Sequence, residues 1–259
     1  MFRTEPCRGF RYEEDEVMTR TETLALYRPV RVSLRRIVNL AMSVCDRTDM
    51  MRAAKQLGLW VNGTIVFPDD NALEMLGDVA LFEPNQHGRR AFDRFLSEKA
   101  PQLDAADFEL AQRMEKAFFS LFRCKGRHEV AGIWLEDLLD EGRSLWLMDE
   151  SAEIFVPAGE TFGLCLFDAG AFYVGFGILP PVDEETIEFC VKSKARGGRS
   201  PFRYSLPVTL YGDSLRADRS TAGISPSWHG GVIELEKDSH RKRKSLPPPL
   251  RSARSRGRN

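Results

Sequence analysis

The stretch IFVPAGETFGLCLFDAGAFYVGFG, residues 154–177, is apolar, rich in aromatic residues and glycine, and almost uncharged. Apolar side chains alternate along it, which is typical of strands that turn one face toward a core. They are Phe162, Leu164, Leu166, Phe172, Val174 and Phe176. Glycines in such a pattern mark places where strands bend tightly or approach closely. We therefore expect two core strands of a small β domain, with these six side chains on one face.

The segment Gly175-Phe176-Gly177 is also similar to part of a glycine-rich phosphate-binding loop. Such a loop follows a strand and opens directly into a helix, whose N-terminus meets the phosphate. Here two prolines follow within four residues, and the third glycine of the fingerprint is missing. The sequence therefore favours a packing role for these glycines over nucleotide binding.

The residues around this stretch indicate further short strands separated by glycine-bearing turns. The predicted strands are Ser120–Cys124, Val130–Leu135, Ser144–Asp149, Glu153–Val156, Phe162–Phe167 and Ala171–Ile178. Short strands at this spacing are typical of a small barrel or sandwich. Two prolines and an acidic first turn then predict a closing helix within residues 180–195.

The N-terminal half has a helical apolar period. We expect a first helix that starts near Pro29, a second one capped by Asp46 or Thr48 and ended by Gly58, and a third after Asp69 or Asp70. Asn62-Gly63 predicts a tight hairpin between the second and third helices. A helix capped by Asp104 follows a shorter one, and its predicted buried stripe is Phe108, Ala111, Met114, Phe118 and Leu121.

The sequence thus predicts an α+β protein with an N-terminal helical part and a small β-hairpin, followed by a small antiparallel β-barrel-like domain and a closing helix. The expected divisions are a flexible N-terminus (1–28), a helical region with the hairpin (29–122), a β-barrel-like region with its closing helix (123–195) and a disordered basic tail (196–259). Met18 is an alternative start of translation.

Charge is distributed unevenly along the 259 residues. Residues 191–259 contain 16 Lys and Arg against 5 Asp and Glu, whereas the first 190 residues contain 21 against 33. A basic tail on an acidic body attracts polyanions, or the body itself. Two other interpretations of the tail stay open: it is a solvated spacer, or, as the loss of any apolar period after Gly197 suggests, an extension without selected function.

The spacing of the cysteines and the hydropathy of the chain indicate in which cellular compartment the protein is expected. The five cysteines are widely spaced and form no pair typical of a disulfide or metal clip, which favours a reducing environment. The N-terminus lacks the apolar segment of a secretory signal, and the longest apolar run is too short to cross a bilayer. We expect a cytoplasmic protein without a membrane partner.

Three groups of residues are candidates for a chemical site. Glu136, Asp137, Asp140 and Glu141 form a carboxylate cluster beside Trp134, which suits a solvated turn or, less readily, acid–base hydrolysis. His128 begins a HEVAG segment that lacks the second histidine of a zinc motif, so we expect neither metal nor cofactor.

The third group concerns nucleic acid. Residues 52–59, RAAKQLGL, are similar to the first helix and turn of a helix-turn-helix, but a hairpin follows where the recognition helix belongs. Phosphate contacts would then come from Arg31, Arg35 and Arg36 of the preceding helix and from Arg241, Lys242, Arg243 and Lys244 of the tail. Against this reading, the body is acidic.

Two stretches carry a family resemblance: AAKQLGLWVNGTIVFPDDNALEMLGDVALFEP, and AFDRFLSEKAPQLDAADFELAQRMEKAFFSLF with the β-rich segment after it. From about Arg31 to Cys190 the chain resembles an uncharacterised bacterial domain family associated in some chains with a SEC-C zinc motif. The SEC-C cysteine cluster is absent here, so the resemblance implies no zinc. The family has no established activity, and the resemblance implies no functional residues.

Without a catalytic set, the first functional hypothesis is a non-enzymatic interaction module with an unknown protein partner. Trp134, Trp146 and Tyr173 are its candidate contact residues. The second hypothesis is a nucleic-acid-associated protein that uses the basic tail and the helix-turn-hairpin unit. The third is a hydrolase that uses the carboxylate cluster.

Overall fold

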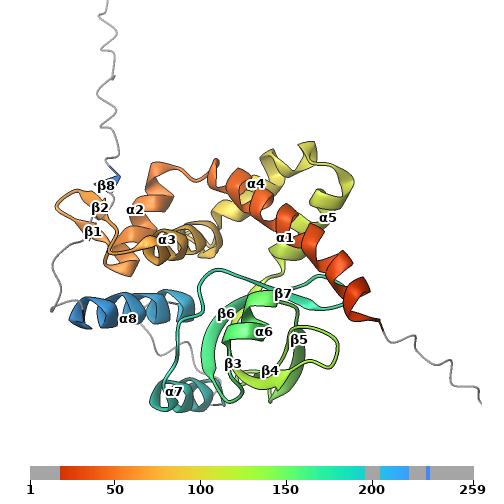
Figure 1. The fold of residues 1–259 in the computed structure, drawn as a ribbon. Coiled ribbons are helices and arrows are strands. Elements are labelled where there is room, and N and C mark those ends of the chain that lie inside the picture. Colours follow the sequence, from red (N-terminus) through yellow and green to blue (C-terminus); the bar gives the residue numbers. More distant parts are fainter. Residues whose placement is uncertain (1–17, 196–204, 222–231, 234–259) are drawn as a thin grey trace, which may run out of the picture.

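The computed structural model describes residues 18–195, 205–221 and 232–233 (Figure 1). Its first helix, α1 (Arg20–Met42), begins at a capping box in which Thr19 and Glu22 bond to each other's backbone N–H groups. Residues 20–28 are therefore helical, and the prediction that they are flexible is wrong.

Pro29 lies inside the helix, where it removes one hydrogen bond. Contacts with the barrel hold the segment before it, including ion pairs of Arg20 with Glu153 and of Arg28 with Glu150.

The next elements form where the turn residues predict them. Helix α2 (Arg47–Leu57) is capped by Asp46 and ends at Gly58 in the left-handed conformation. Strands β1 (Trp60–Val61) and β2 (Thr64–Val66) form the hairpin, with positive φ at Asn62 and Gly63. Strand β8 (Val232–Ile233) pairs antiparallel with β2. Helix α3 (Asp70–Phe82) begins after its cap at Asp69.

Helix α4 (Ala91–Glu98), the 3₁₀ turn η1 (Ala100–Gln102) and helix α5 (Ala105–Glu115) complete the helical half. The predicted cap at Asp104 is confirmed, because its carboxylate accepts from the backbone N–H of Asp107. The helix ends at Glu115, so the prediction that Phe118 and Leu121 belong to its buried stripe is wrong. Both lie in β3 (Phe118–Arg127), which pairs with two other strands.

The β-rich part is a closed five-stranded barrel in the order β3-β4-β5-β7-β6. Its other strands are β4 (Ile133–Asp137), β5 (Arg143–Leu147), β6 (Thr161–Asp168) and β7 (Tyr173–Phe176). Four of the five neighbouring pairs are antiparallel, as predicted, and β5 with β7 is parallel. The predicted strand Glu153–Val156 is instead part of helix α6 (Glu150–Phe155), which Asp149 caps through two backbone N–H groups.

Two helices follow the barrel. Helix α7 (Glu184–Ala195) confirms the predicted closing helix. Helix α8 (Leu206–Thr221) lies within the predicted disordered tail, so that prediction is wrong for these residues. Val208, Tyr211 and Leu215 recur at helical spacing and are buried against α2 and α3, which is why α8 forms. No helix within the described residues is both long and apolar enough to span a membrane.

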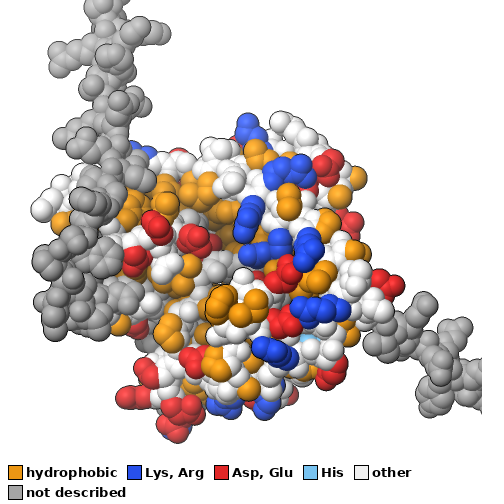
Figure 2. Space-filling model, viewed as in Figure 1, with side chains coloured by type: hydrophobic (Ala, Val, Ile, Leu, Met, Phe, Trp, Pro, Cys, Tyr) orange, Lys and Arg blue, Asp and Glu red, His pale blue; other side chains and the backbone are white. Residues whose placement is uncertain are grey.

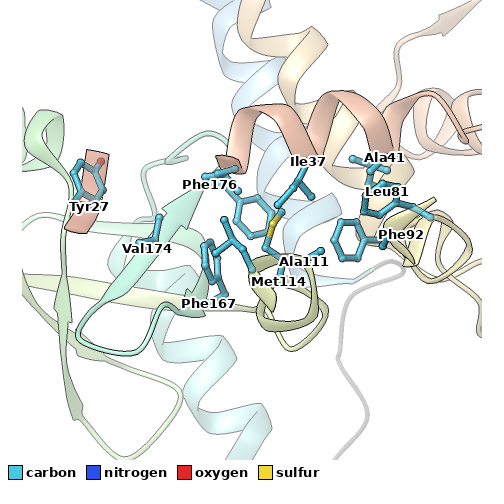
Figure 3. Close-up of a cluster of buried hydrophobic side chains, with 14 of the residues drawn as sticks. Tyr27, Ile37, Ala41, Leu81, Phe92, Ala111, Met114, Phe167, Val174 and Phe176 are labelled. Carbon is cyan, nitrogen blue, oxygen red and sulfur yellow. The ribbon is translucent and has the colours of Figure 1, made fainter. Parts of the chain in front are cut away.

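The stretch 154–177 divides its apolar side chains between two cores. Phe162, Leu164 and Leu166 lie in the cluster that fills the barrel. Phe172, Val174 and Phe176 belong to a different cluster shared with α1, α4 and α5, so the prediction of one common face is wrong (Figure 3). This second cluster contains residues of both the helices and the barrel. The helical region and the barrel therefore share a core across the boundary predicted at residue 122.

Replacing Gly132 by alanine tests how tightly the barrel closes at the start of β4. Gly132 has a φ of +78°, and a Cβ there would collide with the carbonyl oxygen of Leu147 on β5. We expect Gly132→Ala to lower the free energy of unfolding in urea by about 3–5 kcal/mol. Gly63→Ala is the matched control, because Gly63 has a φ of +90° with open space around it, and we expect a loss of about 1–2 kcal/mol. Equal losses would contradict the close contact.

Candidate binding groove between the helices and the barrel

A groove with a volume of about 980 Å³ runs between the helical half and the barrel. Helix α1 forms one wall and α3 the opposite wall, while α6, β7 and residues 177–179 close the remaining side. Figure 2 shows this hollow between Lys and Arg side chains on the α1 side and acidic side chains on the α3 side. The groove therefore exists only because helices and barrel are packed together.

Apolar side chains form the bottom and the rim of the groove. Leu34 and Val38 of α1 line it together with Leu164 and Phe176 of the barrel. On the rim, the Phe155 side chain of α6 is 78% exposed. Nearby large apolar residues are also exposed, among them Leu73, Ile154 and Leu179. An exposed aromatic residue at the edge of an apolar hollow is typical of a binding surface.

Each wall of the groove carries charge. Arg31 of α1 donates to the carbonyl oxygen of Gly175 at 2.9 Å, which fixes it against β7. Arg35, one turn further on, is exposed and has no hydrogen bond or ion pair to any residue that the structure describes. On the opposite wall Glu74 of α3 is likewise exposed and without such a partner among the described residues. The two walls thus present opposite charges to an occupant.

Asp78 of α3 lies at the inner end of the acidic wall. The hydroxyl group of Tyr211 on α8 donates to its Oδ2 at 3.1 Å. Burial raises the pKa of Asp78 to about 7, and the charge of Glu74 adds to this shift. The carboxylate packs directly against the backbone of Gly177, where φ is +80° and a Cβ would collide with Oδ2.

Behind Asp78 lies a smaller cavity of about 110 Å³, also lined by Glu83, Cys165 and Tyr211. Burial raises the pKa values of the Cys165 thiol and the Tyr211 phenol well above their ordinary values, and it raises that of Glu83. At neutral pH the thiol and the phenol are therefore protonated. Cys165 is accordingly a poor nucleophile.

The predicted carboxylate cluster surrounds the turn between β4 and β5, where three of its four members have separate structural partners. Asp137 is buried and accepts from the Ser120 hydroxyl at 2.5 Å and from the Leu139 backbone N–H. Glu136 pairs with Lys125 and Arg123, and Asp140 with Arg143. Glu141 occupies a positive-φ turn position. These contacts account for Asp137, Glu136 and Asp140 without a bound substrate.

The residues proposed for nucleic acid are only partly gathered. On α1, Arg36 pairs with Asp107 and Asp104, and Arg31 is fixed by β7, which leaves Arg35 exposed. Residues Arg241, Lys242, Arg243 and Lys244 lie outside the described residues. Helix α2 is followed by the hairpin, as the sequence predicted, and not by a second helix.

The remaining sequence candidates are packing residues. His128 stacks on Trp146 with ring centroids 3.9 Å apart, and burial lowers its pKa. Trp146 donates to the carbonyl of Ala131, and Trp134 to Glu129. Tyr173 receives a hydrogen bond from Arg143. No group of three or more potential metal ligands occurs in the described part of the chain.

Sequence reasoning missed Asp78 and Tyr211, which lie 133 positions apart. The one signal was the helical spacing of Val208, Tyr211 and Leu215 within a segment dominated by polar residues. Nothing local marks Asp78, because its burial depends on Gly177 and on α8.

The pKa of Asp78 predicts a pH-dependent stability. The folded protein keeps this proton up to about pH 7, whereas the unfolded chain loses it near pH 4, so Asp78 costs stability as the pH rises through this window. We expect Asp78→Asn, which keeps an acceptor for Tyr211, to be more stable than the native protein by about 1–3 kcal/mol at pH 8 and nearly equal at pH 4.5. Urea unfolding at several pH values measures the difference. A difference that is constant between pH 4.5 and 8 would contradict the raised pKa.

Comparison with known proteins identifies a family for the chain, and this family has no known function. No curated protein and no solved structure matches the chain. The model of DUF7986, a family of unknown function, matches residues 19–179 and thus more than half of the 259 residues. The match includes α1, α3, α6 and β7, which surround the groove, and it ends before α7 and α8. The chain belongs to the family DUF7986.

Proposed function

We propose that this protein is a non-enzymatic interaction module that binds a polypeptide segment of another protein in the groove between α1, α3 and the barrel. The observation that carries the proposal is an apolar groove whose two walls bear opposite and unpaired charges. A segment with an apolar residue flanked by an acidic and a basic residue complements such a groove. Arg35 would pair with the acidic residue and the α3 wall with the basic one.

The shape of the groove favours a polypeptide over a small molecule. Figure 2 shows the hollow open to solvent. Phe155 of α6, which lines it, is exposed. Binding sites for small molecules usually enclose most of the ligand surface. An extended chain gains its contacts along the length of an open groove, where exposed aromatic residues contribute most of the binding energy.

The alternatives receive less support from the described residues. Arg36 and Arg31 have partners within the protein, so nucleic-acid binding would depend on Arg35 and the basic tail. Asp137, Glu136 and Asp140 of the β4–β5 turn have structural partners, so the hydrolase hypothesis has no second free carboxylate beside Glu141 at that turn.

We further propose a bacterial, cytoplasmic location. The four cysteines within the described residues, Cys45, Cys124, Cys165 and Cys190, are all free thiols. Free and largely buried thiols suit a reducing compartment. The bacterial origin rests on the family resemblance of the two N-terminal stretches.

Selection from a displayed library of random 12-residue peptides tests the groove. We expect full-length protein to enrich peptides that combine an apolar residue with flanking basic and acidic residues. Phe155→Ser is expected to weaken binding of a selected peptide at least tenfold by fluorescence anisotropy, because it removes the exposed aromatic contact. Arg35→Glu is expected to weaken it as well, by reversing the charge of one wall.

Matched variants separate the groove from the rest of the surface. Phe189→Ser changes another exposed phenylalanine, on α7, and Arg89→Glu changes an exposed arginine outside the groove. Both are expected to leave peptide binding within twofold of the native value. Failure to enrich any peptide, or equal binding by the Phe155→Ser protein, would refute the proposed function.

A further inference from the structure

Asp78 is a carboxylate whose surroundings do not balance its charge. It lines both the groove and the smaller cavity behind it. Its only hydrogen bond among the described residues comes from the neutral hydroxyl group of Tyr211. Asp78 is half-buried, and a carboxylate withdrawn from water is ordinarily compensated by a cation or by several donors.

The charged and titratable groups around Asp78 on the neighbouring elements do not neutralise its negative charge. On α3 itself Glu74 carries the same charge. The Tyr211 phenol of α8 and the Cys165 thiol of β6 are neutral at physiological pH. Arg31 reaches the groove from α1, but its guanidinium donates to the carbonyl of Gly175. Arg90 of the smaller cavity is likewise engaged, because it pairs with Asp93 and donates to the carbonyl of Glu115. No hydrogen bond or ion pair therefore joins Asp78 to a cation among the described residues.

The position of the carboxylate is fixed on the side away from the groove. Tyr211 holds Oδ2 from behind, and Gly177 lacks the side chain that would displace it. Around the approach to Asp78 lie apolar groups of Phe176, Ile178 and Leu179. An apolar passage that ends at a carboxylate matches a side chain with an aliphatic stem and a cationic head.

We propose that Asp78 is the receptor for a basic side chain, lysine or arginine, of the polypeptide bound in the groove. This inference rests on the proposed function and specifies it, since it assigns the basic position of the occupant to one carboxylate. The cationic head would donate to the carboxylate of Asp78, while the methylene groups pack along Phe176 and Leu179. Asp78 thereby acts as a specificity residue, because an occupant without the cation leaves it uncompensated.

Small mimics of the side chain test this site without a known partner. Full-length protein labelled with ¹⁵N is titrated at pH 8 with n-butylguanidinium and n-butylammonium, and n-butanol serves as the uncharged control. We expect saturable shifts of the amide signals of Gly77, Asp78 and Gly177 with at least one cation. Asp78→Asn is expected to weaken that binding at least tenfold, and n-butanol is expected to leave these signals unshifted.

A matched variant separates the buried carboxylate from the general acidity of the wall. Glu74→Gln removes the exposed carboxylate one turn away and is expected to change the affinity for the cation less than threefold. Tyr211→Phe, which keeps the aromatic packing of α8, is a second variant and is expected to weaken binding by loosening the position of Oδ2. Equal cation binding by native and Asp78→Asn proteins would overturn the assignment, as would shifts that n-butanol reproduces.

The two proposals fail in different ways. Cation binding at Asp78 is read directly from the small mimics, so it does not require that a peptide be found. Peptides that bind and depend on Phe155 but bind equally well to the Asp78→Asn protein would retain the proposed function and overturn the role of Asp78. Cation binding at Asp78 without any selected peptide would overturn the proposed function and retain Asp78 as a cation-binding carboxylate.

Discussion

The packing of α1 across the outside of the barrel is the interaction on which the rest of the structure depends. Tyr27 meets Phe172 edge to face at a centroid distance of 6.2 Å, and Ile37 lies in the same buried cluster as Val174 and Phe176 (Figure 3). Burial of these apolar side chains contributes far more than the partly exposed ion pairs between α1 and α6. Because α1 is held in this way, Arg31 and Arg35 line the same groove as Glu74 and Asp78 of α3.

Helix α8 makes a second contribution, since it completes the core that α3 begins. Val208, Tyr211 and Leu215 pack with Leu76 and Val79 of α3. The same tyrosine places its hydroxyl group against Asp78. The family match covers Asp78 and stops before α8, so the position of this carboxylate depends on an element outside the matched segment.

Two aspartates of the chain show how surroundings decide what a carboxylate does. Asp137 is buried with a hydroxyl and a backbone N–H donating to it, and it holds the β4–β5 turn. Asp78 is half-buried with one donor and with a second acid nearby, and withdrawal from water raises its pKa, so its charged form is disfavoured. Each aspartate is followed by an apolar residue in the sequence, Leu138 or Val79, but only Asp78 lines the groove, where an occupant can donate to it.

The sequence alone determined the local features of this protein. Caps at Asp46, Asp69 and Asp104, the Asn62-Gly63 turn and the closing helix follow from backbone hydrogen bonding within a few residues, and the structure confirms them. The barrel itself followed from strand alternation. The groove, the start of α1 before Pro29, the helical state of α6 and α8, and the placement of Asp78 were decided by tertiary structure. Each of these depends on contacts between residues far apart in the chain. Local sequence patterns do not predict the free energy of such contacts.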